Sequence, residues 1–208
     1  MSHKPEEEEE EGPQQEQQQY PLVDNCIFCR IARHEIKPGR RRPNDNRNSQ
    51  QQQQESFLYE SDSVVAFRDA APVSDFHVLI IPKQEHRRTC WDLTSALVQE
   101  MKQVAEQLVL LQHEQQQQQQ EQRESSSAAA ASSSGDNHDG TLLFFSRPPF
   151  FSVPHVHLHV ITRPLTKFSF WNPLHYHYYM PALHVTLPEV EAYLDAKTEK
   201  TTAAASKL

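Results

Sequence analysis

The chain has 208 residues and a formal net charge of −8, and only 37% of its residues are hydrophobic. That fraction is low for a compact domain, so part of the chain is expected to lie outside the core. Basic residues are not in excess, so no nucleic-acid partner is expected, and no apolar run approaches the roughly 20 residues that span a membrane. The three cysteines, in a chain without the pattern of a secretory signal, favour a reducing compartment over a disulfide framework.

Three segments have the composition of chain that does not fold by itself. Residues 1–20 are acidic and rich in glutamine, residues 39–55 hold almost no apolar side chains, and residues 112–139 run through glutamine, serine and alanine. Long surface loops cost little entropy, so the second and third segments are interpreted as low-complexity insertions. The sequence predicts a disordered tail, one domain over 21–198, and a flexible tail at 199–208.

Between these segments, strand signals surround one long helix. Runs rich in β-branched and aromatic residues predict strands over 56–60, 63–68, 76–81, 141–146 and 156–162. Apolar residues spaced three and four apart predict an amphipathic helix from 91 to about 112, and a proline in a first turn predicts a short helix around 188–197. The pattern favours an α+β fold with an antiparallel five-stranded sheet, one long helix and a short C-terminal helix.

The last predicted strand carries three histidines in strict alternation with apolar residues. Side chains two apart on a strand share a face, so His155, His157 and His159 should lie together while their apolar neighbours face the long helix. Such a row has three interpretations. The histidines could lie on the surface, they could form a catalytic metal site completed by Asp75 or His77, or they could form a nucleophilic site. A nucleophilic histidine with two supporting ones explains both the number and the shared face.

The run HVHLHVI resembles the alternating histidine signature of the histidine-triad nucleotide hydrolases and transferases. Further segments are similar to the Hint branch of that family and occur in the same order: CIFCRIA at 26–32, AFRDA at 66–70, FHVLIIPK at 76–83 and PPFFSVPH at 148–155. Pro-Pro-Phe before the triad is typical of eukaryotic Hint members. The resemblance covers about 22–180, and it implies the HIT-like fold and a homodimer.

The resemblance implies five catalytic residues. His157 would attack the α-phosphorus of a nucleotide and form a nucleotidyl-histidine, which water then hydrolyses. Around this nucleophile and the leaving group, the supporting residues would be His155, His159, Ser152 and His77. From the residues alone, Ser152 also fits a turn and His77 an ordinary strand position.

The resemblance also implies the residues that bind the nucleotide. Asp69 would accept hydrogen bonds from the ribose hydroxyls, since one carboxylate can accept two hydrogen bonds from a diol. An apolar slot for the base would be formed by Ile27, Phe28, Ile31 and Phe67, although any hydrophobic core accepts these residue types as well.

Zinc-bearing members of the family bind the metal through residues that correspond here to Cys26, Cys29, His86 and His155. Four nitrogen and sulfur ligands make a closed structural site, so the chemistry itself would require no cofactor. The segment between Pro82 and His86 is one residue longer than the usual spacing in the family. The alternative interpretation is a pair of reduced, buried cysteines.

Together these inferences predict a hydrolase that cleaves the P–N bond of adenosine 5′-phosphoramidates or a related adenylyl bond, with a nucleotide as its small-molecule partner. The alternatives are a nucleotide-binding regulatory or scaffold protein with incidental turnover, and a zinc-catalysed hydrolase. The final Ser206-Lys207-Leu208 matches a receptor-read peroxisomal address. An import receptor is therefore an expected partner, with a peroxisomal location and otherwise a cytoplasmic one.

Overall fold

The computed structural model describes residues 21–38, 57–126, 140–165 and 180–205. The acidic tail, the first predicted insertion and the Ser-Lys-Leu tripeptide lie outside these ranges, so what the sequence suggests for them stays a prediction. Within the ranges, no helix combines the length and the apolar character needed to cross a membrane.

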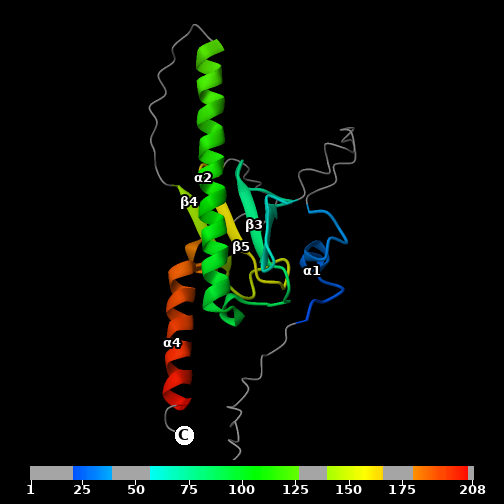
Figure 1. The fold of residues 1–208 in the computed structure, drawn as a ribbon, viewed down its shortest axis with the longest axis vertical. Coiled ribbons are helices and arrows are strands. Elements are labelled where there is room, and N and C mark those ends of the chain that lie inside the picture. Colours follow the sequence, from blue (N-terminus) through cyan, green and yellow to red (C-terminus); the bar gives the residue numbers. More distant parts are fainter. Residues whose placement is uncertain (1–20, 39–56, 127–139, 166–179, 206–208) are drawn as a thin grey trace, which may run out of the picture.

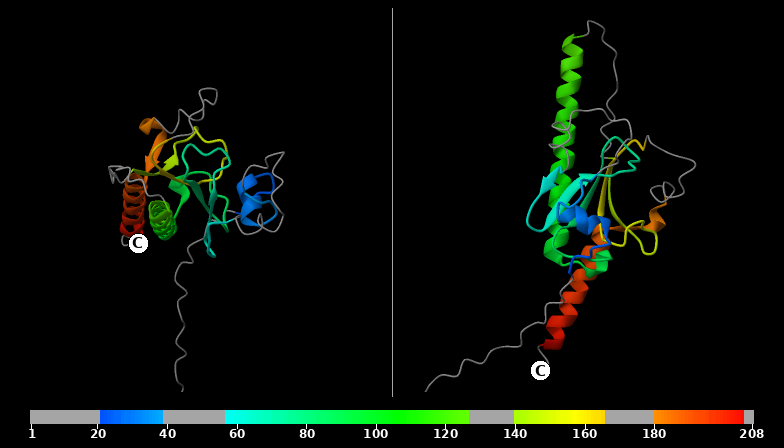
Figure 2. Two further views of the ribbon diagram at one scale, coloured as in Figure 1. Left: turned by 90° about the horizontal axis from the view of Figure 1, so that it is seen from above. Right: turned by 90° about the vertical axis from the view of Figure 1, so that its right-hand side faces the viewer.

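One antiparallel sheet of six strands forms the centre of the described structure, in the order β1-β2-β3-β5-β4-β6. The strands are β1 (Tyr59–Glu60), β2 (Val64–Arg68), β3 (His77–Pro82), β4 (Thr141–Ser146), β5 (Leu158–Thr162) and β6 (His184–Thr186). The α-helices are α1 (Ile27–Ala32), α2 (Ser95–Ser126) and α4 (Leu187–Ala205), with short 3-10 helices η2 (Cys90–Asp92) and η3 (Pro181–Leu183). Helices α2 and α4 lie side by side on one face of the sheet, and α1 lies on the other (Figures 1 and 2).

Every residue of β3 is buried because both faces of the central sheet are covered. The face toward α2 carries Leu158 and Val160 of the histidine strand, as the alternation predicts. It packs against buried helix residues, namely Val98, Met101, Val104, Ala105 and Leu108. The face toward α1 carries Phe67 and Leu79, which pack against Phe28 and other buried residues of that helix.

The predicted α+β fold with an antiparallel sheet is confirmed, but the strand count is six rather than five. The additional strand is β6, whose three residues pair with the outer edge of β4. Three residues are too few to show a period of two, so the sequence contained no local signal for it. Helix α1 was missed for the same reason, since its six residues make fewer than two turns.

The long helix starts later than predicted. Its N-cap is Thr94, whose hydroxyl accepts a hydrogen bond from the Leu97 N–H at 3.3 Å. Trp91, where the sequence prediction began the helix, lies instead in the 3-10 helix η2. The apolar spacing continues unchanged across both segments, so periodicity alone does not locate the cap.

Both α2 and α4 extend further toward their C-terminal ends than predicted. The sequence interpretation ended α2 near 112 and placed an insertion in a loop from there, but the helix continues to Ser126. Similarly, α4 runs to Ala205, so most of the predicted flexible tail at 199–208 is helical. Gln, Glu, Lys and Ala all have favourable helix propensity, which extends a helix that packing has already nucleated.

Candidate active site

The register of β2, β3 and β5 brings two histidines and a carboxylate together. Leu79 of β3 lies opposite His159 of β5, so His77, two residues from Leu79, shares the face of His159. Asp69 follows the end of β2, and its N–H donates to the His77 carbonyl at 3.0 Å, which continues the strand pairing. His77 Nε2 then lies 3.0 Å from His159 Nδ1 and 3.5 Å from an Asp69 carboxylate oxygen.

This arrangement can store a proton. The Val73 N–H donates to His77 Nδ1 at 3.4 Å, so His77 carries its proton on Nε2, between His159 Nδ1 and the Asp69 carboxylate. The other ring nitrogen of His159, Nε2, lies 3.3 Å from Ser146 Oγ, and both residues line the central cavity. His159 can therefore exchange a proton with a bound molecule at Nε2, while His77 holds the ring of His159 at Nδ1.

The middle histidine of the triad has a defined tautomer. His157 Nδ1 lies 2.7 Å from the backbone carbonyl of His155. A carbonyl only accepts, so Nδ1 carries the proton and Nε2 keeps its lone pair. Burial lowers the pKa of His157, which favours the neutral ring. A neutral imidazole with a free lone pair on Nε2 is a nucleophile.

A cavity of about 280 Å³ lies in front of His157 and His159. Its walls come from α1, from the end of β2 and from the loop between β4 and β5. Eight of the residues predicted from the sequence line it: Ile27, Phe28, Ile31, Phe67, Asp69, Ser152, His157 and His159. Of the other predicted catalytic residues, His77 lies behind His159, and His155 turns its Nδ1 toward the two cysteines.

Asp69 is already partly engaged by the protein. One carboxylate oxygen accepts the Ala71 N–H at 2.7 Å, and the other faces His77. A carboxylate offers about four acceptor positions, so lone pairs remain for the hydroxyls of a ligand. Asp69 thus links the cavity to the histidine pair, a second role that the sequence did not suggest.

The end of β4 and the β4–β5 loop contribute cavity residues that the sequence analysis missed. Ser146, Phe150 and Phe151 line the cavity, and Phe150 is half exposed at its rim. Only the pairing of β4 with β5 places Ser146 near the triad, because Phe144, two residues before it, lies opposite His159. A serine at the end of a predicted strand, two residues before a pair of prolines, was the available signal.

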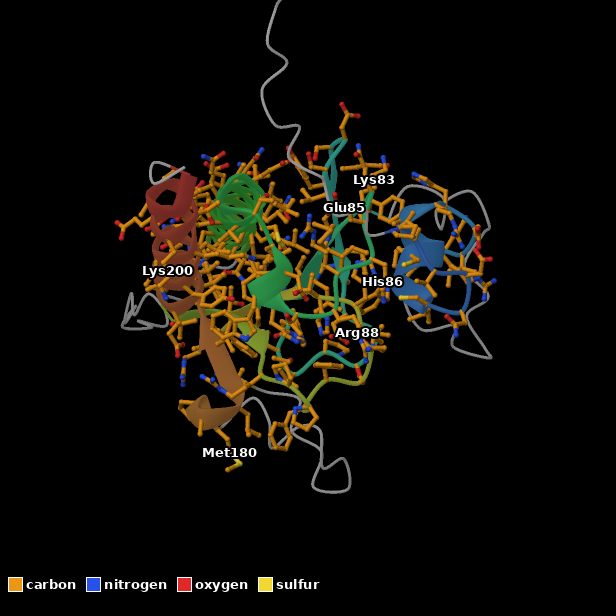
Figure 3. All side chains as sticks on the ribbon, turned by 90° about the horizontal axis from the view of Figure 1, so that it is seen from below. Lys83, Glu85, His86, Arg88, Met180 and Lys200 are labelled. Carbon is orange, nitrogen blue, oxygen red and sulfur yellow. The ribbon has the colours of Figure 1, made fainter. Side chains whose placement is uncertain are left out.

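Behind the triad, the four predicted metal ligands converge. His155 Nδ1 lies 3.6 Å from Cys26 Sγ and 3.4 Å from Cys29 Sγ, and His86 Nδ1 lies 3.2 Å from Cys29 Sγ. One ligand atom from each of the four residues lies within 4.8 Å of all the others. His86 is on the loop after β3, beside α1 (Figure 3), so the additional residue in this loop does not keep it away.

The cluster fits a zinc ion in its geometry and in its donor atoms. Tetrahedral zinc with bonds of roughly 2.0–2.3 Å separates its ligand atoms by about 3.3–3.8 Å, close to the distances found here. Burial lowers the pKa of His155 to about 3, which keeps its ring neutral and able to bind a metal. Burial also raises the pKa of the Cys29 thiol to about 11, and a bound dication would reverse that shift because it deprotonates its thiol ligands.

A family model and several curated proteins are similar to this chain over most of its length. The family model described as "Scavenger mRNA decapping enzyme C-term binding" matches residues 44–175, which include the whole triad. Adenosine 5′-monophosphoramidase HINT3 of Mus musculus is 27% identical over 153 residues, covering 73% of this chain and 71% of that protein. The bifunctional adenosine 5′-phosphosulfate phosphorylase/adenylylsulfatase HINT4 of Arabidopsis thaliana is 31% identical over 144 residues, covering 67% and 70%.

Among solved structures, a HIT family protein from Bacillus anthracis is 21% identical, with a TM-score of 0.46 over 88% of this chain and 97% of that one. The family assignment rests on the model match and the curated relatives, together with the triad and the α+β sheet. The chain belongs to the histidine-triad family of nucleotide hydrolases, in its Hint branch.

Proposed function

We propose that the protein cleaves the P–N bond of adenosine 5′-phosphoramidates, or a related adenylyl bond, through a nucleotidyl intermediate on His157. The observation that carries the proposal is the hydrogen bond from His157 Nδ1 to the His155 carbonyl. The proton of His157 is therefore on Nδ1, and the lone pair on Nε2 is available for attack. The nucleophile therefore needs no general base before it attacks.

In the first step, His157 Nε2 attacks the α-phosphorus and a new P–N bond forms. The bond from phosphorus to the leaving nitrogen breaks, and its electron pair stays on that nitrogen. His159 Nε2 donates the proton that the leaving amine requires, while His77 Nε2 contacts the Nδ1 of His159 on the other side of the ring. Ser146 and Ser152 are hydroxyl donors on the same wall of the cavity, available to the phosphate oxygens.

In the second step, water attacks the phosphorus of the nucleotidyl-histidine. The bond to His157 Nε2 breaks and the nucleoside monophosphate is released. His159 Nε2 takes the proton that water gives up, which restores the proton donor of the first step. His159 is thus the acid of the first step and the base of the second.

The adenosine specificity in the proposal is supported by two relatives, the adenosine 5′-monophosphoramidase HINT3 and the adenosine 5′-phosphosulfate phosphorylase/adenylylsulfatase HINT4. The cavity supports a nucleoside in general terms. Phe28 and Phe67 form an apolar wall, with ring centroids 5.8 Å apart, and Asp69 lies at the edge of that wall. A planar base fits such a wall, and a ribose fits the carboxylate.

Asp69→Asn tests the ribose contact. An amide accepts less well than a carboxylate and also removes the negative charge beside His77, so we expect kcat/KM for a ribonucleotide substrate to fall about 10- to 100-fold. The ratio of kcat/KM between the ribose substrate and its 2′,3′-dideoxy analogue should fall toward one in the variant. If that ratio is unchanged, Asp69 does not bind the ribose.

A structural zinc ion held by Cys26, Cys29, His86 and His155 is a second part of the proposal. It is supported by the converging sulfur and nitrogen atoms and by the burial of Cys26, Cys29 and His155. Four protein ligands leave no open position, so the metal would stabilise the fold and fix His155, whose carbonyl orients His157.

The central test is mass spectrometry of protein quenched within one turnover of an adenosine phosphoramidate. We expect the mass of one AMP to be added to the chain, on the peptide that contains His157. Binding without turnover would favour the regulatory alternative. The homodimer implied by the family and the peroxisomal address stay predictions.

A further inference from the structure

A row of three stacked aromatic rings crosses the sheet at the active site. The ring of His184, on β6, stacks on Phe144 with centroids 3.6 Å apart and an interplanar angle of 11°. Phe144 in turn stacks on His159, at 5.0 Å and 21°. All three side chains are at least nine-tenths buried. The C-terminal strand therefore contacts the triad through a single intervening ring.

The strand register explains why the rings are aligned. Phe144 of β4 lies opposite His159 on β5 and opposite Thr186 on β6. His184 is two residues from Thr186, so it shares the face of Phe144 and His159. The stack is thus a property of three paired strands and does not depend on the conformation of one loop.

β6 also pairs with the end of β4, which carries Ser146, the second hydrogen-bonding neighbour of His159. Ser146, whose hydroxyl lies 3.3 Å from His159 Nε2, pairs with His184 in the sheet. The next residue, Arg147, donates from its backbone to the Leu183 carbonyl at 2.8 Å and from its guanidinium to the His184 carbonyl at 3.0 Å. β6 therefore contacts both the stacked Phe144 ring and the end of β4 that carries Ser146.

We infer that His184 is a positioning residue that fixes the plane of the His159 ring for proton transfer to the leaving group. His77 contacts Nδ1 of His159 and Ser146 contacts Nε2, and both contacts lie at the edge of the ring, so neither presses on its faces. The Phe144 ring, with His184 stacked on it, packs against a face of His159 and limits its tilt. This inference rests on the proposed role of His159 as the acid, and it assigns the C-terminal strand to the catalytic apparatus.

Two substrates with different leaving groups distinguish positioning from simple structural support. An alkylamine leaving from an adenosine phosphoramidate needs a proton, whereas p-nitrophenolate leaving from an AMP aryl ester does not. We expect His184→Ala to lower the single-turnover rate of amine release from the alkylamine substrate about tenfold, while the burst rate of p-nitrophenolate release from the ester stays within about twofold. Both rates report the first step alone, because the later attack of water is common to the two substrates. His184→Phe keeps a flat ring on Phe144 and should restore most of the lost rate.

Tyr193→Ala is the matched control. Tyr193 lies on α4, and its ring centroid is 4.9 Å from that of Trp91. The variant therefore removes an aromatic contact of the C-terminal region that does not involve the triad. It should affect the two substrates equally. An equal loss on both substrates in His184→Ala, or no recovery in His184→Phe, would overturn the inference. Failure of the proposed function would be recognised separately, because wild-type protein would then form no adduct on His157.

Discussion

His157→Ala is expected to abolish phosphoramidate turnover, with kcat falling about 10³-fold or more, because the variant has no nucleophile to form the covalent intermediate. Rapid-quench mass spectrometry should find an AMP adduct in wild-type protein and none in the variant. The change removes a ring that contacts Phe28 and His159, so folding is checked by the thermal transition of both proteins. His113→Ala, at an exposed position of α2, is the control and should behave as wild type.

The same experiment separates the alternatives. Unchanged turnover in His157→Ala would contradict the covalent mechanism and favour a zinc-catalysed hydrolase. That alternative predicts immediate loss of activity when a chelator is added. A structural zinc ion predicts that activity outlasts the chelator at first and declines only as the fold loosens.

Cys29→Ser is expected to remove bound zinc and to lower the thermal midpoint by roughly 10 °C. When the concentration of free zinc is about 1,000 times the dissociation constant, zinc binding stabilises the fold by about 4 kcal/mol. In a domain of 150–250 residues, losing that free energy lowers the Tm by roughly 10 °C. The measurements are zinc content by elemental analysis and Tm with and without chelator. Cys29 is completely buried in the cluster.

Cys90→Ser is the matched control for this variant. Cys90 is as buried as a core residue and lies outside the four-residue cluster, so it should lose packing energy but keep zinc. A chelator should lower the Tm of wild type and of Cys90→Ser and leave that of Cys29→Ser unchanged. If zinc-supplied wild-type protein contains no zinc and ignores the chelator, the metal proposal fails.

Local sequence periodicity was sufficient for much of the fold. Alternation identified the histidine strand and correctly directed Leu158 and Val160 toward α2, because a period of two is a property of adjacent residues. The strand at 141–146 was predicted with its observed limits for the same reason. The motif residues around the cavity were found from the family resemblance, since no spacing rule connects Asp69 with His157.

The features that were missed depend on contacts distant in sequence. β6 exists because β4 offers it an edge, and neither strand encodes the other in its own composition. Ser146 and Phe144 become active-site neighbours only when β4 and β5 pair in one particular register. The additional residue before His86 does not keep its ring from the other three predicted ligands, because a loop can accommodate one residue while its ends stay fixed.

Helix α2 continues past the end of the sheet, and its final turns project away from the domain (Figure 1). The glutamines at 115–120 lie in that projecting part, and all six are exposed. Each glutamine gained or lost by repeat slippage would change the reach of this arm by about 1.5 Å and turn its tip by about 100°. Allelic variation in repeat length would therefore alter how far the arm reaches and which side its tip presents, while the catalytic constants stay the same.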